Sequence, residues 1–315
     1  MRTQGRRLFR RIASPLIGLL SALCLVPAAL AQQRYLNLTW VDRSGEVIGT
    51  IGAPGEYRGV DVSSDGRVAA HAHSGNGGDV WLFAPNGKGT RLVAEATGVQ
   101  DNAHPIFSPD GKRIVYSSLR DGVWGLYIKS VDGSGGEERV YGSGRTTVPM
   151  SWSPDGRFIV FWENTGFEWV LPLAGGRTPF RLMTDQSSHS QISPDGKWVA
   201  YLAGGNVWVR GFPAGTKAVP VSSEAGFFPR WRADGRELFY VGLDNLLHAV
   251  AVSGPLDFGE PKPLFRIAGA PQYGTTRDFQ FDVSPDGQRF IMPTTGSVPP
   301  VPYTVIENWQ DKFRR

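Results

Sequence analysis

The sequence contains a single cysteine among 315 residues, Cys24, which lies in an apolar N-terminal stretch. One thiol cannot form an intrachain disulfide, so the fold depends on packing and hydrogen bonding. The sequence also lacks the G-x-S-x-G elbow of the α/β-hydrolases and the glycine-rich and catalytic loops of protein kinases, which argues against both enzyme classes. Glycine and proline, in contrast, number 40 and 23, which is typical of a chain with many tight turns and few long helices.

Residues 1–31 have the pattern of a secretory signal peptide. Five arginines and no acidic residue accompany an apolar stretch that ends at Ala31 in the small-x-small pattern of a cleavage site. An uncleaved membrane anchor is the alternative, but Pro15 and Pro27 leave the apolar part short of the ~20 residues that a spanning helix needs. The sequence therefore predicts a periplasmic or secreted protein with one domain over residues 32–315 and no membrane span after cleavage.

The charge of the mature chain argues against nucleic-acid and lipid partners. The whole sequence has 33 Lys and Arg and 29 Asp and Glu, but residues 1–31 hold five of the arginines and none of the acids. The remaining 28 basic and 29 acidic residues nearly cancel. Such a balance gives no general attraction to nucleic acid or to anionic lipid. We therefore expect no nucleic-acid partner.

A short motif recurs along the chain and indicates the architecture. The stretch FSPDGK, residues 107–112, has five close variants, and every one contains Asp-Gly. Ser accepts a local hydrogen bond, Pro fixes φ, and Gly adopts the left-handed conformation that closes a hairpin. A repeat at intervals of 39 to 52 residues is typical of propellers and related arrays. The turn aspartates are Asp65, Asp110, Asp155, Asp195, Asp234 and Asp286.

An alternating strand follows each turn, as in RIVYSS from residue 113, and a third strand and a weaker fourth strand complete each repeat. Six such units predict an all-β, six-bladed β-propeller with four antiparallel strands per blade. Residues 35–52 resemble two strands with no partner before them, so we expect these N-terminal strands to join the last blade and close the ring. The place of residues 303–309 stays open.

The repeated residues are expected to build structure rather than to bind ligands. The turn aspartates lack the dense D-x-D-x-D run of calcium loops, so we interpret them as turn formers. Three residues before each aspartate lies a large or branched side chain that should pack between blades. These six residues are Val62, Phe107, Trp152, Ile192, Trp231 and Val283.

Ligand contacts are expected at the other end of the blades, in the loops before each first strand and between each second and third strand. These loops mix both charges with aromatic residues, which suits a protein or peptide partner. We predict a monomer that needs no cofactor. The candidate binding residues are Arg58, Asp101, His104, Arg145, Asp185, His189, Phe228, Tyr273 and Arg277.

The histidines keep an enzymatic alternative open, because six-bladed lactonases and lyases use a metal or a histidine in the central funnel. His71 and His73 lie two residues apart in a predicted strand and share one face, and Asp79 is a candidate third ligand. His104 and His189 occupy equivalent repeat positions and could line the funnel. The sequence shows no dense cluster of acids and amides, so we predict no metal site and a non-enzymatic binding role.

The SPDG repeat resembles the WD40-like propeller repeat of TolB-type proteins. Segments 38–52, 152–162 and 230–242 are most similar to the extracytoplasmic C-terminal propeller of bacterial serine/threonine protein kinases. The resemblance runs from about Tyr35 to Trp309 and implies a free-standing exported sensor or scaffold. A component of a cell-envelope complex like TolB is the other function it implies, although we find no room for the α/β domain that precedes the propeller in TolB.

Overall fold

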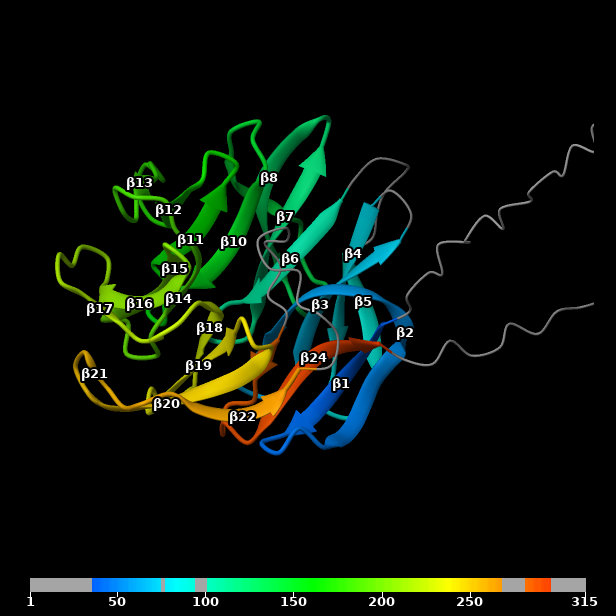
Figure 1. Cartoon of the computed structure of the whole chain (residues 1–315). Coiled ribbons are helices and arrows are strands. Elements are labelled where there is room, and N and C mark those ends of the chain that lie inside the picture. Colours follow the sequence, from blue (N-terminus) through cyan, green and yellow to red (C-terminus); the bar gives the residue numbers. More distant parts are fainter. Residues whose placement is uncertain (1–35, 75–76, 94–100, 268–280, 296–315) are drawn as a thin grey trace, which may run out of the picture. The chain divides into compact units, whose positions relative to one another are not determined.

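The computed structural model describes residues 36–74, 77–93, 101–267 and 281–295 (Figure 1). These residues form antiparallel β-sheets that follow one another in chain order. We call each four-stranded unit a blade. No helix that could cross a membrane occurs in this described part. The predicted signal peptide and residues 303–309 lie outside it.

The first three blades account for residues up to 181. Within each of these three blades, the innermost strand comes first in the chain. Blade 1 consists of the second half of β2 (Val47–Val62), β3 (Val68–Ser74), β4 (Gly77–Phe83) and β5 (Gly89–Val93). Blade 2 consists of β6 (Asn102–Phe107), β7 (Arg113–Arg120), β8 (Val123–Ser130) and β9 (Glu138–Gly142). Blade 3 consists of β10 (Thr147–Trp152), β11 (Phe158–Glu163), β12 (Phe167–Pro172) and β13 (Phe180–Arg181).

The last three blades use the rest of the chain and return to its beginning. Blade 4 consists of β14 (Ser188–Ile192), β15 (Trp198–Ala203), β16 (Asn206–Gly211) and β17 (Ala218–Pro220). Blade 5 consists of β18 (Gly226–Trp231), β19 (Glu237–Gly242), β20 (Leu246–Gly254) and β22 (Lys262–Arg266), with β21 (Asp257–Phe258) also paired to β20. Blade 6 consists of β23 (Asp282–Val283), β24 (Arg289–Thr295), β1 (Leu36–Asp42) and the first half of β2.

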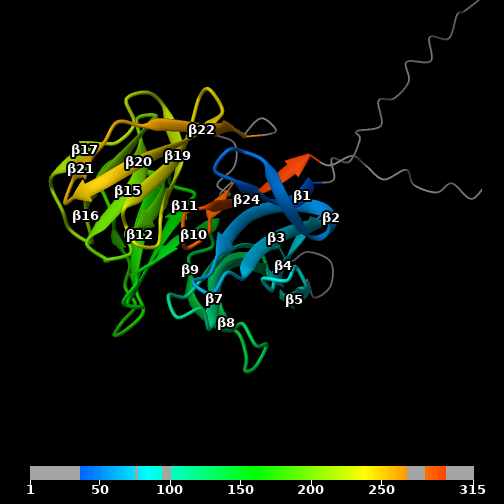
Figure 2. The same cartoon turned by 90° about the horizontal axis from the view of Figure 1, so that it is seen from below.

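The ring closes through the N-terminal strands, which confirms the prediction (Figure 2). All seven residues of β1 pair with β24, and the other edge of β1 pairs with β2. β2 is 16 residues long and continues from blade 6 into blade 1. Each innermost strand contacts the next one in the order β2, β6, β10, β14, β18 and β23, and β23 contacts β2 again. The chain is therefore a six-bladed β-propeller.

The repeated turn joins the two innermost strands of each blade, as expected from its sequence. In blade 2 the Ser108 hydroxyl donates to Asp110 at 2.6 Å and accepts the backbone N–H of Arg113 at 2.9 Å. Gly111 has a φ of 67°, a region in which only glycine is unstrained. Blades 1, 3, 4 and 6 repeat the Ser–Asp hydrogen bond at 2.5 to 2.6 Å. In these five blades the aspartate is thus part of the hydrogen bonding within the turn.

The hydrophobic core lies between neighbouring blades. Phe107 of blade 2 packs with Val80 of blade 1, and Trp231 of blade 5 packs with Val207 of blade 4. Trp152 of blade 3 packs in the same way against strands of blade 2. The residues three positions before the turn aspartates therefore hold consecutive blades together, as their size and spacing predicted.

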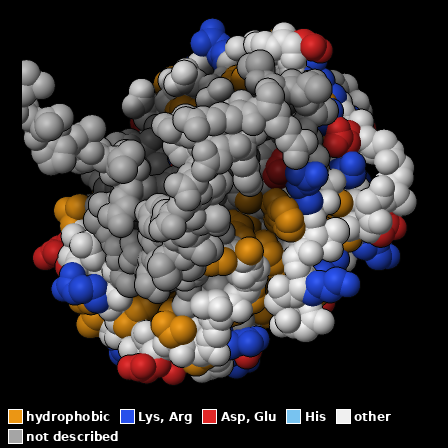
Figure 3. All heavy atoms as spheres, turned by 90° about the vertical axis from the view of Figure 1, so that its right-hand side faces the viewer, with side chains coloured by type: hydrophobic (Ala, Val, Ile, Leu, Met, Phe, Trp, Pro, Cys, Tyr) orange, Lys and Arg blue, Asp and Glu red, His pale blue; other side chains and the backbone are white. Residues whose placement is uncertain are grey.

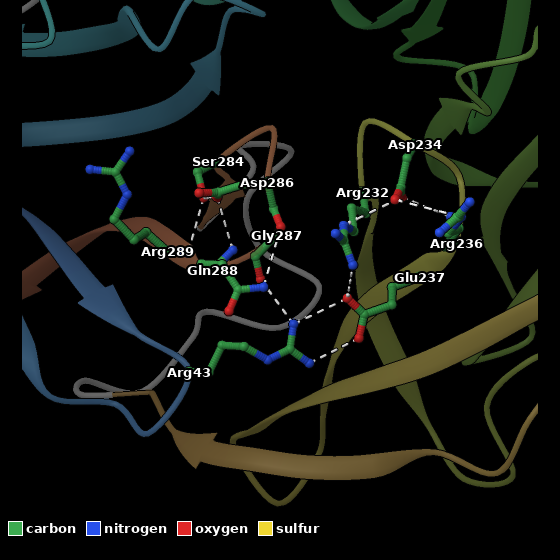
Figure 4. Close-up of polar contacts among 10 residues, drawn as sticks. All are labelled: Arg43, Arg232, Asp234, Arg236, Glu237, Ser284, Asp286, Gly287, Gln288 and Arg289. Atoms are coloured by element: carbon green, nitrogen blue, oxygen red, sulfur yellow. Dashed lines mark hydrogen bonds and ion pairs between the residues drawn. The ribbon is translucent and has the colours of Figure 1, made fainter.

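Arg43, in the turn between β1 and β2, adds a polar link between blades 5 and 6 (Figure 4). Its guanidinium donates to both carboxylate oxygens of Glu237, at 2.9 and 3.1 Å, and to the carbonyl oxygen of Gly287 at 2.9 Å. Glu237 also receives a hydrogen bond from Arg232 at 3.2 Å. A bidentate pair of this kind fixes geometry better than a single contact. The closing hairpin is thereby anchored to the turns of its neighbours.

Candidate functional site

Innermost strands begin at the end of the blades opposite the SPDG turns, and we call this end the rim. A β-bulge interrupts the pairing of the innermost strand in blades 1 to 5. In blades 1, 2, 4 and 5 the bulge includes the residue six positions before the turn aspartate, and in blade 3 it follows that residue directly. In the first four of these blades the φ of that residue is 55° to 57°, and these residues are Gly59, His104, His189 and Phe228. Bulges commonly redirect side chains next to functional sites.

The candidate binding residues separate into groups rather than forming one surface. Arg58, Asp101 and His104 lie together at the rim of blades 1 and 2, where Arg58 and Asp101 both act on the pKa of His73 and His104 acts on the pKa of Asp101. His189 and Phe228 are both buried, and their rings meet edge to face at 4.6 Å. They are therefore packing residues and not exposed contacts.

The remaining candidate residues have less to connect them. Arg145 and Asp185 are exposed in the loops that precede β10 and β14. Tyr273 and Arg277 lie outside the described residues. The rim of blades 1 and 2 is consequently where the structure brings the most candidate functional side chains together.

His71 and His73 form the centre of this group. Both lie on β3, and their rings are 5.8 Å apart. One ligating atom from each, together with a carboxylate oxygen of Asp101, lies within 4.8 Å of the others. His71 Nε2 is 3.5 Å from Asp101 Oδ1, and the ring of His104 is 6.0 Å from that of His71. The three side chains converge on one point at the rim.

Asp79, the candidate third ligand, does not lie with the two histidines. Asp79 on β4 pairs with Ala72 on β3, whereas His71 and His73 pair with the residues on either side of it. Because neighbouring residues of a strand face opposite sides of the sheet, Asp79 points away from both histidines. Its carboxylate lies 3.3 Å from Arg91 instead. Asp101, which the sequence suggested only as a rim residue, lies beside the two histidines instead.

The electrostatics of the cluster favour an ionised acid beside a neutral imidazole. Burial alone would raise the pKa of Asp101, but its contact with His71 at 3.5 Å and the nearby His104 and His73 outweigh it, so the pKa lies below its ordinary value. Burial, with help from Arg58, lowers the pKa of His73. At neutral pH a carboxylate therefore faces an imidazole with a free lone pair, which is the state that binds metal.

A second polar group, on the propeller axis, was missed by the sequence reasoning. Four residues before the turn aspartate, the innermost strands carry residues that converge around a cavity of about 170 Å³. We call these the axial residues. Those lining the cavity are Asp61, Ile106, Ser151, Gln191 and Arg230. Polar residues at a fixed position within otherwise apolar strands were the signal that could have revealed them.

Most of the axial residues hold neighbouring blades together. Asp61 accepts the backbone N–H of Phe107 at 2.8 Å. Ser151 accepts that of Ile192 at 3.0 Å, and Gln191 accepts that of Trp231 at 2.6 Å. Arg230 is fully buried and lies 3.2 Å from Asp282 of blade 6. These contacts are satisfied within the fold, so the axial group supports structure.

Comparisons with known proteins agree on the fold. No model of a known protein family matches the sequence. An uncharacterized protein of Agrobacterium fabrum is 31% identical over 187 residues, which is 58% of this chain and 52% of that relative. A tricorn protease homolog of Streptomyces coelicolor is 32% identical over 151 residues, or 42% of this chain and 14% of that protein. The chain thus spans about half of the first relative and a small part of the second.

Solved structures are similar at lower sequence identity. A "putative TolB" from Agrobacterium tumefaciens superposes with a TM-score of 0.66 and 17% identity, covering 84% of this chain and 99% of that one. An oligogalacturonate lyase in complex with manganese gives a TM-score of 0.52 and 15% identity, covering 80% of this chain and 76% of that one. Likeness at this level shows a TolB-type propeller fold. The sequence match to the tricorn protease homolog shows a distant similarity.

Proposed function

We propose that the chain is an exported, non-enzymatic binding propeller that holds a protein or peptide ligand at its rim. The TolB-type fold supplies a rigid scaffold, and fold alone does not specify a ligand. The periplasmic or secreted location rests on the signal-like residues 1–31. The resemblance to the kinase-associated propellers, on segments such as 152–162, supports a sensor or scaffold role of the same kind.

The observation that carries the proposal is a difference between the two ends of the blades. The turn end repeats one chemistry, because five turns share the same Ser–Asp hydrogen bond. The rim end varies at its bulge, where Gly59, His104, Pro149, His189 and Phe228 occupy one repeat position. His104, which lies in the rim group of blades 1 and 2, keeps its side chain at positive φ, which costs ~1–2 kcal/mol. Strain of this kind gathers at functional sites.

The charge pattern supports a protein ligand rather than a polyanion. At the rim of blade 1, Arg58 forms an ion pair with Glu56. Arg145 and Asp185 add one charge of each sign. On the face in Figure 3, basic and acidic side chains are interspersed over the described surface. Mixed charges beside apolar groups are typical of protein interfaces.

A matched pair of double variants tests the proposal. The rim variant Arg58→Ala/Arg145→Ala removes two positive charges from the rim, and Arg157→Ala/Lys197→Ala removes two from exposed positions at the turn end. Each protein and the wild type would capture partners from an envelope extract, and the dissociation constants would then be measured. We expect one partner whose binding weakens ~10-fold in the rim variant alone, as for an interface of average contacts. Capture of no partner, or equal affinity for all three proteins, contradicts the proposal.

A metal- or histidine-dependent lactonase or lyase is a second candidate, favoured by the convergence of His71, His73 and Asp101. The propeller fold that the chain shares with an oligogalacturonate lyase is compatible with it. Incubation with lactones and with oligouronides separates the two functions. Turnover that His73→Ala abolishes supports the enzyme, and no turnover of either class leaves the binding function. If the chain acts in an envelope complex like TolB, the captured partner would be a component of such a complex.

A further inference from the structure

We propose that His71, His73 and Asp101 form a binding site for one divalent transition-metal ion of the Zn²⁺ class. The proposal goes beyond the rim-binding function and does not depend on it. Two imidazoles and one carboxylate are a common ligand set for such ions. The three side chains come from β3 and from the segment that leads into β6, so the folded blades bring them together.

The distances between the ligating atoms fit a metal site that a small side-chain movement would complete. Metal–ligand bonds of ~2.0–2.2 Å place two tetrahedral ligand atoms roughly 3.4 Å apart. His71 Nε2 and Asp101 Oδ1 already lie 3.5 Å apart. All the ligating atoms lie within 4.8 Å of one another, so side-chain shifts of roughly 1 Å would complete the set.

The ligating atoms are buried and lack hydrogen-bond partners within the described residues. These atoms include both ring nitrogens of His71, Nδ1 of His73 and Oδ1 of Asp101. His71 itself is only 3% exposed. Buried polar groups are nearly always satisfied, and leaving one unpaired costs ~1–3 kcal/mol. A metal ion would satisfy several of them at once.

Gly78 keeps the position of the ion open. A Cβ atom at this residue would lie 2.0 Å from His71 Nε2 and 2.9 Å from Asp101 Oδ1. Gly78 is not among the glycines with positive φ, so the backbone does not require glycine here. It also forms a bridge to Asp101, and the Asp101 carbonyl accepts the N–H of Leu119 at 2.9 Å. The backbone is thus fixed, and no side chain of residue 78 competes for the space beside His71 and Asp101.

The ligand set predicts both the kind of ion and the kind of molecule that would bind to it. Ca²⁺ and Mg²⁺ prefer oxygen ligands, whereas imidazole favours Zn²⁺ and its neighbours. Three protein ligands leave a fourth position for water or for an oxygen atom of a bound molecule. Arg58 pairs across the strands with His71 and would attract an anionic group to this position. We therefore expect a carboxylate or another oxyanion as the metal-bound group of a rim ligand.

Metal titration of the purified protein tests the site without any partner. We expect one equivalent of Zn²⁺ by calorimetry and elemental analysis, a visible absorption band with Co²⁺, and no saturable binding of Ca²⁺. His73→Ala and Asp101→Asn should each weaken Zn²⁺ binding by ~100-fold or more, beyond the usual effect of an outer-shell partner. Unchanged thermal unfolding of the metal-free variants would show that the fold is intact.

His248→Ala is the matched control. His248 also lies beside one acid, with Nε2 3.4 Å from Asp244, but within the described part of the chain it belongs to no group of three potential metal ligands. We expect this variant to bind Zn²⁺ like the wild type. A wild type that binds no Zn²⁺, or a His73→Ala variant that binds it equally well, overturns the proposal. Either result leaves the rim-binding function standing, because that function is measured with a partner protein.

Discussion

Asp282 of blade 6 accepts a 2.6 Å hydrogen bond from the backbone N–H of Val62 in blade 1, a residue 220 positions earlier in the chain. The same carboxylate lies 3.2 Å from Arg230 in blade 5. One side chain therefore connects three blades at the point where the ring closes. Asp61, Ser151 and Gln191 make the equivalent backbone contact between other blades.

Replacing Asp282 should lower the unfolding free energy more than the size of its side chain suggests. Asp282→Ala removes the acceptor of the Val62 N–H and the carboxylate beside the buried Arg230, and breaking a buried ion pair costs ~3–5 kcal/mol. Ile106→Val changes the equivalent axial position of blade 2, which makes no such contact, and should cost ~0.5–1.5 kcal/mol. Chemical unfolding of both variants measures the difference. Equal losses would show that the Asp282 contacts add nothing to closure.

The stability of the protein should fall as the pH rises from about 4 to about 8. Burial, and then repulsion from Asp282, raise the pKa of Asp61 to about 8, and Arg230 offsets this only in part. Between about pH 4 and about pH 8 the folded state holds a proton on Asp61 that the unfolded state has released. The stability that this proton gives is therefore complete below pH 3.8, the ordinary pKa, and is lost as the pH rises to about 8. One such proton changes the unfolding free energy by at most ~1.4 kcal/mol per pH unit.

Asp61→Asn provides the check on this pH dependence. The amide oxygen can still accept the N–H of Phe107, but the side chain no longer titrates. Unfolding free energies measured at several values between about pH 5 and about pH 9 should therefore vary less with pH than in the wild type. Asp65, whose pKa is lowered to about 2 chiefly by Arg67, acts below this range. An unchanged slope in Asp61→Asn would assign the effect to another group.

The sequence predicted the fold well because short-range sequence signals determine the structure of each repeat. The Asp-Gly turns, the alternating strands and the large residues such as Trp152 all follow from short-range rules. The orphan strands at residues 35–52 were enough to predict ring closure. Those signals need only a few neighbouring residues, and the turns repeat them six times.

The candidate site was harder to predict because it depends on contacts across blades. His71 and His73 could be paired from their spacing, but Asp101 reaches them only after β4 and β6 come side by side. Sequence proximity favoured Asp79, which the strand register turns to the other face. His189 was a candidate contact residue at the rim, because no local sequence signal shows that the ring of Phe228 in the next blade packs against it.

The closing strand should be among the positions most sensitive to truncation. Leu38 on β1 is fully buried between β24 and β2, so Leu38→Ala should lower the unfolding free energy by ~2–5 kcal/mol. Val47 lies in the same closing hairpin but is 64% exposed, and Val47→Ala should stay within ~0.5 kcal/mol of the wild type. Urea unfolding compares the two. A small effect at Leu38 would mean that β1 is not needed to hold the ring closed.

One substitution should stabilise the protein by restoring the repeat. Four turns have Pro where blade 5 has Ala233, and the blade 5 turn makes the same contact, with Gly235 N–H donating to the Arg232 carbonyl at 2.9 Å. Proline fits this conformation in the other blades, so Ala233→Pro should add ~0.4–1 kcal/mol by restricting the unfolded chain. Ala233→Gly should act in the opposite direction for the same reason. Thermal unfolding should therefore rank the variants as Pro, Ala and Gly from most to least stable, and a less stable proline variant would show that the blade 5 turn differs from the others.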